Sequence, residues 1–407
     1  MSENAQKPRI RFKGFSDAWE QRKAKELFNS TADKGYPELP VLSATQDRGM
    51  IRRDENSINI FHDKKNESGY KRVLPGQFVI HLRSFQGGFA HSTLEGITSP
   101  AYTVFGFSEP EKHDSEYWKY VFTSKEFIRR LETVTYGIRD GRSISYDEFL
   151  TLDFVYQSKA EQTAIARYLD KLSDLITLHQ RKYDKLVAVK KSLLEKMFPA
   201  DGETVPKIRF KGFSDAWEQR KLWQLTIWDK KFNGVESYKQ VKVIKYPYVL
   251  ADVFSQIEDT SGTVRLLSTG SYIGYTTKEK AGNNLCYGEI VAIPWGGVAN
   301  IKYYNGFFVT ADNRIATSSN MQVLSNRYLH WWMESNITQI QSTYRGASIQ
   351  HPSMNDILSL SIYLPSIEEQ EKISNKLDTL DNLITLHQRQ LEKLKNIKSA
   401  LLEKMFV

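Results

Sequence analysis

Arginine and glutamine side chains stand on two glycine-rich stretches in the first half of the chain. Arg83 and Gln86 lie in RSFQGG, directly after an apolar run typical of a strand, and Arg139 and Arg142 lie in GIRDGR. Guanidinium forks and side-chain amides make paired hydrogen bonds to the edges of nucleic-acid bases, while surrounding cations neutralise phosphates. These four residues are therefore candidates for contact with bases.

The second half of the chain offers comparable residues at the corresponding places. Trp295 opens a WGG stretch, and Tyr344, Arg345 and Gln350 lie within YRGASIQ. A basic cluster in the first half supplies candidate ligands for phosphate, namely Lys64, Lys65, Lys71 and Arg72. The alternative for each of these residues is an ordinary one, because glycine-rich loops turn chains and most surface cations are simply solvated.

The sequence lacks the common catalytic motifs. It contains no Pro-Pro pair, as the Asn/Asp-Pro-Pro-aromatic loop of DNA amino-methyltransferases requires, and no Gly-Lys pair, as a Walker A loop requires. The zinc motifs HExxH and CxxC do not occur, and the single cysteine, Cys286, excludes an intrachain disulfide. We therefore expect no catalytic residue and no metal ligand, while a nuclease site assembled from distant carboxylates stays open as an alternative.

Composition favours a globular protein with an acidic partner. The chain has 407 residues, a net charge of +8 and 12% aromatic residues, which suits two or three folded domains. The basic excess favours nucleic acid or an anionic membrane as the partner. The N-terminus is polar and no apolar run approaches the ~18 residues of a membrane span, so we expect a cytoplasmic protein without membrane attachment.

Three segments of the sequence occur twice. Pro8–Lys23 recurs as Pro206–Lys221 with one Arg-to-Lys change. The other two repeats end each half, with LITLHQR at 175–181 and 383–389, and LLEKMF at 193–198 and 401–406. Because each copy is far longer than a solenoid or propeller unit, the chain is predicted to hold two similar halves in tandem with internal pseudo-two-fold symmetry.

A long helix is predicted at the end of each half, because apolar residues recur there at alternating steps of four and three. The predicted seam of the first helix is Ile165, Leu169, Leu172, Ile176, Leu186, Leu193 and Met197. That of the second is Ile373, Leu377, Leu380, Ile384, Leu391, Leu394, Leu401 and Met405. So narrow an apolar stripe needs a partner, and we expect the two helices to pair as an antiparallel coiled coil.

Polar residues mark the ends and the interior of these helices. Each helix is predicted to begin with a capping box, Ser158 with Glu161 and Ser366 with Glu369, in which the serine accepts from a free amide and the glutamate reaches back. The seams are interrupted by His179 and Lys190 and by the equivalent His387 and Lys398. Polar residues on a seam typically fix its register.

The segments before the helices differ strongly in sequence but share β-branched and aromatic runs broken by Gly, Asn, Asp and Pro, which predict strands and turns. Short helices are expected at 117–132 and 328–339. We predict a mixed α/β fold with a first domain at 1–157, a first long helix at 158–198, a linker at 199–206, a second domain at 207–364 and a second long helix at 365–407.

This architecture resembles the specificity subunits of type I restriction-modification enzymes. The resemblance rests on the paired FKGFSDAWE segments at Phe12–Glu20 and Phe210–Glu218, the two LLEKMF helix ends, and GITSPAYTVF at Gly96–Phe105. It covers essentially the whole chain. The resemblance implies that each variable segment is a target recognition domain for one half of a bipartite, asymmetric site in double-stranded DNA, and that the helices set the spacing between them.

The same resemblance implies the partners and the missing chemistry. In this family the helices dock two adenine-N6 methyltransferase subunits, and ATP-driven endonuclease and translocase subunits join them. S-adenosylmethionine, ATP and Mg²⁺ would then bind the partner subunits, and this chain would itself be non-catalytic. One alternative is a pseudo-symmetric coiled-coil scaffold for two proteins that never touches DNA, and the other is the nuclease mentioned above.

Overall fold

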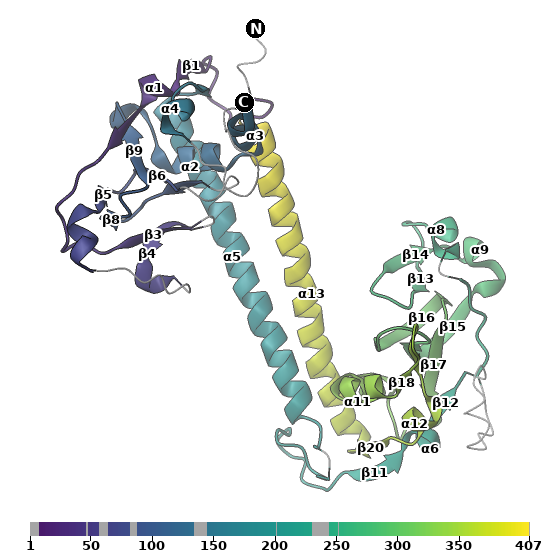
Figure 1. Cartoon of the computed structure of the whole chain (residues 1–407). Helices are drawn as coiled ribbons and strands as arrows, with labels where there is room; N and C mark the ends of the chain where they lie inside the picture. Colours follow the sequence, from purple (N-terminus) through teal and green to yellow (C-terminus); the bar gives the residue numbers. More distant parts are fainter. Residues whose placement is uncertain are drawn as a thin grey trace. The chain divides into compact units, whose positions relative to one another are not determined.

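The computed structural model describes residues 8–45, 48–56, 64–81, 88–133, 145–200, 202–229, 244–250 and 252–406. The chain forms two compact units (Figure 1). The first comprises Met1–Gln180 together with Arg389–Val407, and the second comprises Arg181–Gln388. Each unit thus contains part of both long helices. The domain boundaries predicted at the helix starts follow a different division and stay a prediction.

The first unit is built on a four-stranded sheet of order β2-β9-β6-β7, accompanied by the two-stranded pairs β3-β4, β5-β8 and β1-β10. All of these pairings are antiparallel. The strands are β1 (Glu20–Lys23), β2 (Phe28–Thr31), β3 (Leu42–Thr45), β4 (Gly49–Arg52), β5 (Lys71–Val73), β6 (Phe78–Ile80), β7 (Phe89–His91), β8 (Gly96–Thr98), β9 (Thr103–Phe107) and β10 (Asp153–Tyr156).

Helices cover this sheet and close its aromatic core. They are α1 (Ala24–Leu27), α2 (Ser115–Thr123), α3 (Lys125–Thr133), α4 (Tyr146–Phe149) and the start of α5 (Lys159–Lys196), with 3₁₀ turns at Arg53–Glu55, Lys64–Gly69 and Pro110–Lys112. Phe28 of β2 and Trp118 of α2 are fully buried and meet edge to face at 5.3 Å. Phe105 and Phe149 complete the contact around Phe28. Such rings supply a large buried area at a geometry that their quadrupoles favour.

The second unit is built on a larger sheet of order β12-β17-β15-β16-β13-β14. Its pairings are antiparallel except between β13 and β16, which are parallel. The strands are β11 (Glu218–Lys221), β12 (Thr226–Trp228), β13 (Val264–Leu267), β14 (Ile273–Thr276), β15 (Cys286–Pro294), β16 (Lys302–Thr310), β17 (Asn313–Ser318), β18 (Tyr344–Arg345), β19 (His351–Pro352) and β20 (Ser361–Leu364).

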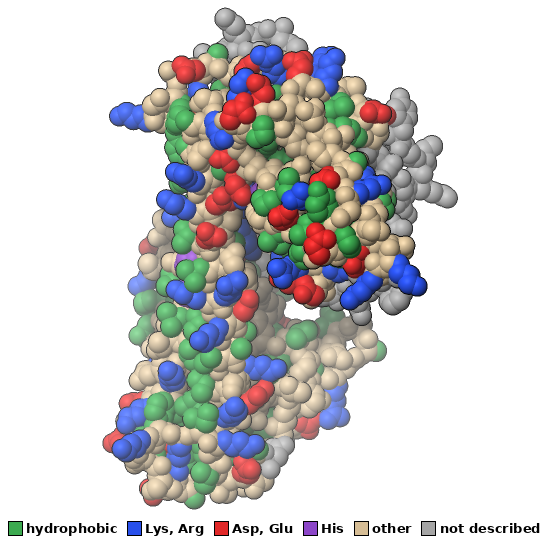
Figure 2. Space-filling view, turned by 90° about the vertical axis from the view of Figure 1, so that its left-hand side faces the viewer, with side chains coloured by type: hydrophobic (Ala, Val, Ile, Leu, Met, Phe, Trp, Pro, Cys, Tyr) green, Lys and Arg blue, Asp and Glu red, His purple; other side chains and the backbone are tan. Residues whose placement is uncertain are grey.

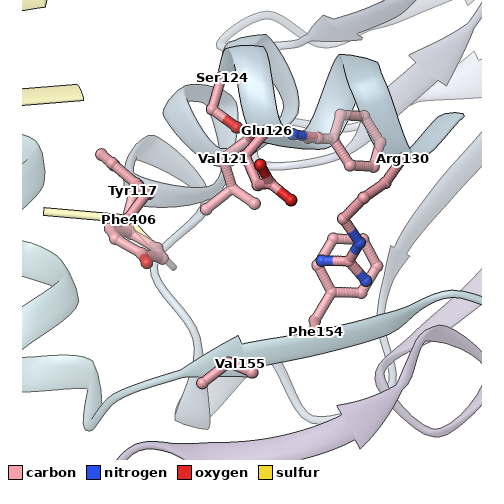
Figure 3. Close-up of a pocket in the computed structure, with 9 residues that line it drawn as sticks. Tyr117, Val121, Ser124, Glu126, Arg130, Phe154, Val155 and Phe406 are labelled. Carbon is pink, nitrogen blue, oxygen red and sulfur yellow. Dashed lines mark hydrogen bonds between the residues drawn. The ribbon is translucent and has the colours of Figure 1, made fainter. Parts of the chain in front are cut away.

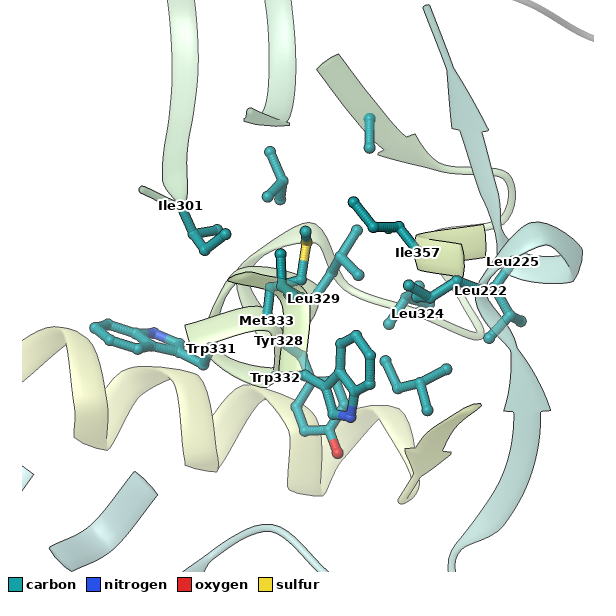
Figure 4. Close-up of a cluster of buried hydrophobic side chains, with 14 of the residues drawn as sticks. Leu222, Leu225, Ile301, Leu324, Tyr328, Leu329, Trp331, Trp332, Met333 and Ile357 are labelled. Carbon is teal, nitrogen blue, oxygen red and sulfur yellow. The ribbon is translucent and has the colours of Figure 1, made fainter. Parts of the chain in front are cut away.

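A buried cluster joins this sheet to its helices (Figure 4). Tyr328, Leu329 and Trp332 of α10 pack beside Leu222 and Ile357, all of them nearly inaccessible to solvent. The helices of the unit are α6 (Leu222–Leu225), α8 (Val253–Ile257), α9 (Lys278–Ala281), α10 (Asn326–Ser335), α11 (Ile337–Ser342), α12 (Met354–Leu358) and α13 (Ile367–Lys404), with a 3₁₀ turn at Gly282–Asn284. Cys286 is a buried free thiol on β15.

The two short helices predicted at 117–132 and 328–339 are each broken into two. Ser124 separates α2 from α3 with an extended ψ of 146°, and Asn336 separates α10 from α11 with a ψ of 20°. Ser124 Oγ donates to Val121 O, and Asn336 Nδ2 donates to Trp332 O. Polar side chains that satisfy the backbone locally compete with helix propagation, and this explains the breaks that apolar periodicity did not reveal.

The long helices α5 and α13 are each 38 residues long and lie within the predicted ranges. All of the predicted seam side chains are buried or half-buried. In the first unit Met405, near the end of α13, shares a core with Ile165 and Leu169 near the start of α5. In the second unit Met197, at the end of α5, shares a core with Ile373 and Leu377 near the start of α13. Within each unit the helices therefore run antiparallel, as predicted.

The predicted capping boxes are used differently from the prediction. Ser366 Oγ accepts from Glu369 N at 3.3 Å. The two glutamates, however, accept hydrogen bonds from arginines of the repeated segments Pro8–Lys23 and Pro206–Lys221, which we call the leader segments. Glu161 accepts from Arg11 Nε and Nη2, both at 2.7 Å, and Glu369 accepts from Arg209 Nε and Nη2 at 2.8 and 2.9 Å. Both carboxylates are about 1% exposed, so a charged, bidentate partner offsets their desolvation better than one amide would.

Each leader segment also holds the end of a long helix. In the first unit Ile10 N donates to Lys404 O of α13 at 3.1 Å, and in the second Ile208 N donates to Lys196 O of α5 at 2.8 Å. After these contacts the leaders form β1 and β11, which pair with β10 and β20. The two units thus repeat one order of elements, and the predicted fold class is confirmed.

Candidate nucleic-acid interface

Two loops that the sequence singled out in the second half are joined in the structure. The first follows β15, where Trp295 N donates to Asp312 O at 2.9 Å. Gly297 then adopts a φ of 93°, which favours glycine, and its N–H donates to Gln350 O at 2.9 Å. Gln350 belongs to the second loop, between β18 and β19. The two loops therefore form one surface, which we call the reading surface and define as Trp295–Val298 with Tyr344–His351.

His351 makes the second bond between these loops. Its Nδ1 lies 2.7 Å from Trp295 O, and because a carbonyl oxygen only accepts, Nδ1 carries the proton. The imidazole also lies against the indole of Trp295, with ring centroids 4.7 Å apart. The Arg314 guanidinium also lies over that indole, 4.0 Å from the ring centroid. The Trp295 ring thus contacts both a cation and a second ring, which restrict its orientation.

The remaining predicted residues of this surface differ in what they contact. Tyr344 is 5% exposed, its hydroxyl donates to Pro294 O at 3.0 Å, and burial raises the pKa of that hydroxyl. Tyr344 therefore positions the loops. Arg345 is exposed, and its Nη2 lies 2.5 Å from Asp356 Oδ2. Gln350 is exposed as well. Arg345 can exchange Asp356 for a ligand, because exposed ion pairs are weakly held.

Two exposed apolar side chains lie on the reading surface. Val298 is 75% exposed and Ile349 is 62% exposed, one on each of the joined loops. Aliphatic groups suit the methyl group of thymine, and amide and guanidinium groups suit adenine and guanine edges. The surface therefore combines the donors, acceptors and apolar groups that direct reading of bases requires.

The basic cluster predicted in the first half is described in the structure. Lys64 and Lys65 are exposed on a 3₁₀ turn. Lys71 Nζ instead donates to Tyr102 O at 2.6 Å, and burial lowers the pKa of this lysine. Arg72 donates to Glu95 from Nε at 2.9 Å, and its guanidinium lies 4.5 Å from the centroid of the Tyr36 ring.

Lys71 and Arg72 therefore have partners within their own domain. Those contacts compete with phosphate binding, whose assignment to the cluster stays a prediction. Arg83, Gln86, Arg139 and Arg142, the base-reading candidates of the first half, lie outside the described residues. On the face drawn in Figure 2 basic and acidic side chains are interspersed rather than segregated.

Sequence reasoning missed one group of residues in the second unit. Arg265, Tyr275, Lys302 and Tyr304 lie on three neighbouring strands and interact with one another. The Arg265 guanidinium lies 5.2 Å from the centroid of the Tyr275 ring. The pKa of Tyr304 is raised, by burial first and then by the charge of Tyr275, while Arg265 lowers it. The signal available in the sequence was the two-residue spacing of Lys302 and Tyr304 on β16, and nothing local links these two residues to Arg265 and Tyr275.

The first unit contains a small cavity near its core and a wider one of about 490 Å³ lined by Arg9, Glu126, Ser399 and Glu403, among others. The small cavity, of about 20 Å³, lies between α2, α3 and β10 of the first unit and is lined by Tyr117, Arg130, Phe154 and Phe406, among others (Figure 3). It has space for about one water molecule. Tyr117 and Phe406 stack at 5.3 Å, so this region closes the end of α13 against the domain. Among the described residues no cluster of three His, Cys, Asp or Glu side chains suited to a metal ion was found.

No helix in the described residues is long and apolar enough to cross a bilayer.

Comparison with known proteins points in one direction. Residues 215–396 match the family model described as the type I restriction modification DNA specificity domain. The chain is 30% identical over 107 residues to the type I restriction enzyme EcoDI specificity subunit of Escherichia coli. It is 24% identical over 170 residues to the type I restriction enzyme MjaVIII specificity subunit of Methanocaldococcus jannaschii. These matches take in 26% and 40% of this chain and span 24% and 38% of the lengths of the two relatives.

The fold agrees with a solved structure over nearly the whole chain. The crystal structure of the type I restriction-modification system S subunit from M. genitalium superposes with a TM-score of 0.59 at 15% sequence identity. The match takes in 98% of this chain and 99% of that one. The shared fold therefore includes both units and both long helices, whereas the family match is confined to the second half.

Proposed function

Because the chain belongs to the DNA-specificity subunits of type I restriction-modification systems, we propose that it selects the DNA sequence on which its partners act. Each unit contributes one target recognition domain, and each domain reads one half of a bipartite site in double-stranded DNA. The two domains differ in sequence and in sheet order, so the two half-sites differ and the whole site is asymmetric.

The observation that carries this proposal is the joining of the Trp295 loop to the Tyr344–His351 loop. A surface that reads bases must hold its side chains in fixed positions, since a misplaced donor loses the paired hydrogen bond. The bonds from Gly297 N to Gln350 O and between His351 and Trp295 O supply that rigidity. They hold the exposed Val298, Ile349 and Gln350 at a common rim.

The long helices serve as the spacer between the two half-sites. Each has 38 residues, or about 57 Å at ~1.5 Å per residue. With base pairs ~3.4 Å apart, this length sets an upper limit of about 17 base pairs on the separation of the half-sites. The unspecified gap between them is expected to be shorter and constant.

The helices also carry two equivalent surfaces for a modification subunit. Leu175 and Leu178 of α5 are 42% and 47% exposed, and their repeats Leu383 and Leu386 of α13 are 38% and 48% exposed. Large apolar side chains kept exposed in both copies of one motif mark interaction sites. We propose that each LITLHQR motif docks one adenine-N6 methyltransferase subunit, giving two per chain, and that endonuclease and translocase subunits join this core.

In this scheme the chain itself is non-catalytic. S-adenosylmethionine, ATP and Mg²⁺ bind the partner subunits, and the complex works in the cytoplasm, where its DNA is. The docking proposal is tested by replacing Leu178 or Leu386 with Asp and weighing the purified complex. Each single variant should retain one modification subunit and the double variant none. Two bound copies in the double variant would refute this assignment.

The reading function is tested by co-expressing the chain with a modification subunit of the same system and mapping N6-methyladenine across the genome. One bipartite motif with a constant gap is expected. Methylation at a continuous motif, or none from a complex that assembles, would contradict the proposal. Salt-independent association with DNA would favour the scaffold alternative, because phosphate contacts make affinity fall steeply with salt.

An exchange of domains sharpens the test. Replacing residues 27–156 with the first recognition domain of another specificity subunit should change one half of the methylated motif and leave the other half and the gap intact. The reciprocal exchange of residues 223–364 is the matched control and should change only the other half.

A further inference from the structure

One face of the six-stranded sheet in the second unit carries two cations and two tyrosines beside a buried cluster that includes Leu267, Cys286 and Ile290. Residues paired across neighbouring strands share a face, and alternate residues along a strand do so as well. Arg265 pairs with Tyr275 on β14 and with Phe308 on β16. Tyr304 and Lys302 follow Phe308 at even spacing along β16, so all five side chains belong to the same face. Tyr275 is 41% exposed there, and Arg265, Lys302 and Tyr304 are half-buried.

Among the described residues, two hydrogen bonds hold the Lys302 ammonium in place. Its ammonium donates to Ser268 O at 2.7 Å and to Thr269 O at 3.1 Å, which uses two of its three N–H groups. Arg265 lies over the Tyr275 ring at 5.2 Å. Across the described part of the chain neither cation has a carboxylate within ion-pair distance, in contrast to Arg314 with Asp312 and Arg345 with Asp356 in the same unit.

The electrostatics of this face favour a negatively charged ligand. Burial, and after it the charge of Arg265, lowers the pKa of Lys302 to about 8. Two positive charges are thus kept near each other and partly out of water, which costs free energy in the absence of an anion. The other ionisable groups on the same face of the described strands are Tyr275, Tyr304 and the buried thiol of Cys286, which pairs with Phe308. The pKa of Tyr304 is raised, by burial first and then by Tyr275, so its hydroxyl stays protonated and can donate.

We propose that Arg265 and Lys302 bind a backbone phosphate of the DNA, with the hydroxyl groups of Tyr275 and Tyr304 as further donors, next to the bases read by the Trp295 loop. This inference rests on the proposed function. The occupant is double-stranded DNA, because the site adjoins the reading surface and has the charge complementary to a phosphate. The site contacts the half-site of the second domain and carries no sequence information of its own.

The site and the reading surface are continuous through the turn between β13 and β14. Lys302 binds the carbonyls of Ser268 and Thr269, and Asn300 Nδ2 donates to Gly270 O of the same turn at 3.2 Å. Asn300 follows Ala299, whose N–H donates to Gln341 Oε1 directly after the Trp295–Val298 loop. A phosphate contact at Lys302 would therefore fix the register of the domain on the duplex.

The proposal links DNA binding to protons in a defined direction. A bound phosphate favours the charged ammonium and raises the pKa of Lys302 above its value of about 8 in the free protein. Above that pH the free protein must take up a proton on binding, so affinity falls as pH rises. For one fully linked lysine the loss between pH 7 and pH 9 is about tenfold.

The test uses the full chain in complex with its modification subunits and a duplex carrying the methylated motif. Lys302→Met, which keeps the length of the side chain, should make the plot of log affinity against log salt shallower by about 0.9, the share of one phosphate. It should also remove the pH dependence between 7 and 9. Lys302→Arg should restore the salt slope but not the pH dependence, because guanidinium does not titrate in this range.

Two further variants separate binding from folding. Arg265→Met should also make the salt slope shallower by about 0.9. Lys278→Met is the matched control, since Lys278 is an exposed lysine of α9 that stacks at 3.9 Å on Phe307, a residue of the opposite sheet face; its slope and pH dependence should match those of the wild type. Circular dichroism and thermal unfolding check that Lys302→Met folds.

The outcomes distinguish this inference from the proposed function. If the wild-type complex binds the duplex and folded Lys302→Met keeps the same salt slope and pH dependence, the phosphate site is refuted while the reading function stands. If the wild-type complex shows no salt-dependent binding at all, the reading function itself fails. A Lys302→Met slope that changes no more than that of Lys278→Met also counts against the site.

Discussion

The first and second units attach different domains to long helices of similar sequence through equivalent contacts. Gln162 of α5 accepts from Asp114 N, and Gln370 of α13 accepts from Ser325 N, both at 2.9 Å. Further along, Asp170 accepts from the Tyr120 hydroxyl at 2.6 Å. In the second unit Asp378 accepts from Trp331 Nε1 at 2.7 Å. The two long helices thus present the same acceptors at equivalent positions, and the two domains donate to them from different residues.

A lysine on the seam completes each of these contacts. Lys398 Nζ lies 5.4 Å from the centre of the Tyr120 ring, and Lys190 Nζ lies 4.8 Å from that of Trp331. Lys190 also pairs with Asp381 of the opposite helix, in keeping with the register role predicted for it. In both units the helix carboxylate therefore accepts from an aromatic residue with a polar hydrogen, which is a tyrosine in the first unit and a tryptophan in the second.

The largest effect is expected at the paired leader arginines. Arg11→Ala and Arg209→Ala each leave a nearly inaccessible glutamate without its partner, which should lower the free energy of unfolding by about 3–5 kcal/mol. Chemical denaturation of the purified chain measures this loss. Arg22→Ala, at an exposed pair with Glu20, is the control and should change nothing measurable. A large difference between the two leader variants would break the equivalence of the units.

A similar comparison applies to the seam. Leu169 and Leu377 occupy equivalent positions and are both fully buried. Replacing either with Ala should cost about 2–5 kcal/mol through lost burial and the remaining cavity. Leu175→Ala is the matched control, because Leu175 lies on the same helix and is 42% exposed. Equal losses for the two buried leucines would support equal packing in both units, and a loss at Leu175 as large as theirs would contradict the assigned seam.

The units should also differ in which residue makes them sensitive to acid. Burial, followed by the charge of Lys190, lowers the pKa of His330 to about 4. The corresponding residue of α2 is Lys119, which hydrogen bonds to Asp170 and Glu116 and stays charged. Since an unfolded histidine titrates near 6.5, the unfolded chain alone takes up this proton as pH falls. The free energy of unfolding therefore falls by up to about 3 kcal/mol as pH decreases from 6.5 to 4 because of His330.

His330→Gln should flatten the dependence of unfolding free energy on pH within that window. In the first unit His113, whose pKa burial also lowers to about 4, should give a separate and additive effect when changed to Gln, because the two residues lie in different units. Denaturation curves at half-unit pH steps provide the measurement. An unchanged slope in His330→Gln would show that the imidazole is not kept neutral in the folded protein.

The smallest effect concerns the donor aromatic itself. Tyr120→Phe removes only the hydroxyl that donates to Asp170, and should cost about 1.5–3 kcal/mol because the acceptor is charged. Trp331→Phe should cost at least as much, since it also removes buried ring area. Exchange of the donors, Tyr120→Trp and Trp331→Tyr, should retain more stability than either Phe variant. If the exchanged variants unfold with a free energy no higher than that of the Phe variants, an aromatic hydrogen-bond donor at this position is not sufficient.

Much of the structure of the long helices and the repeated segments could be predicted from the sequence, because the signals for them are local or repeated. The seam spacing that includes Leu169 and Leu377 predicts α5 and α13 directly. Glu161 and Glu369 were assigned to caps, yet they bind arginines located 150 and 160 residues earlier in the chain. A capping pattern describes what a side chain can do locally, and it contains no information on a stronger partner brought in by folding.

The reading surface was predicted in parts and assembled only by the tertiary structure. Trp295 and Gln350 were both candidates, but the bonds that join their loops, from Gly297 to Gln350 and from His351 to Trp295, connect residues far apart in the sequence. Tyr344 was a candidate for base contact and proves to be buried, with its hydroxyl on Pro294 O. Lys302 was not a candidate, because nothing in its neighbourhood along the chain distinguishes it from a solvated lysine.

By itself, the sequence determined that the chain is duplicated, that each copy ends in a long amphipathic helix, and that the domains between the repeats differ. These properties follow from periodicity and identity, which short-range interactions translate into structure. The tertiary structure alone decided which loops meet, which of the described cations lie beside one another without a carboxylate, and which donors bind the helices. Those outcomes depend on contacts between residues distant in the chain, where burial and charge pairing, rather than local pattern, select the partner.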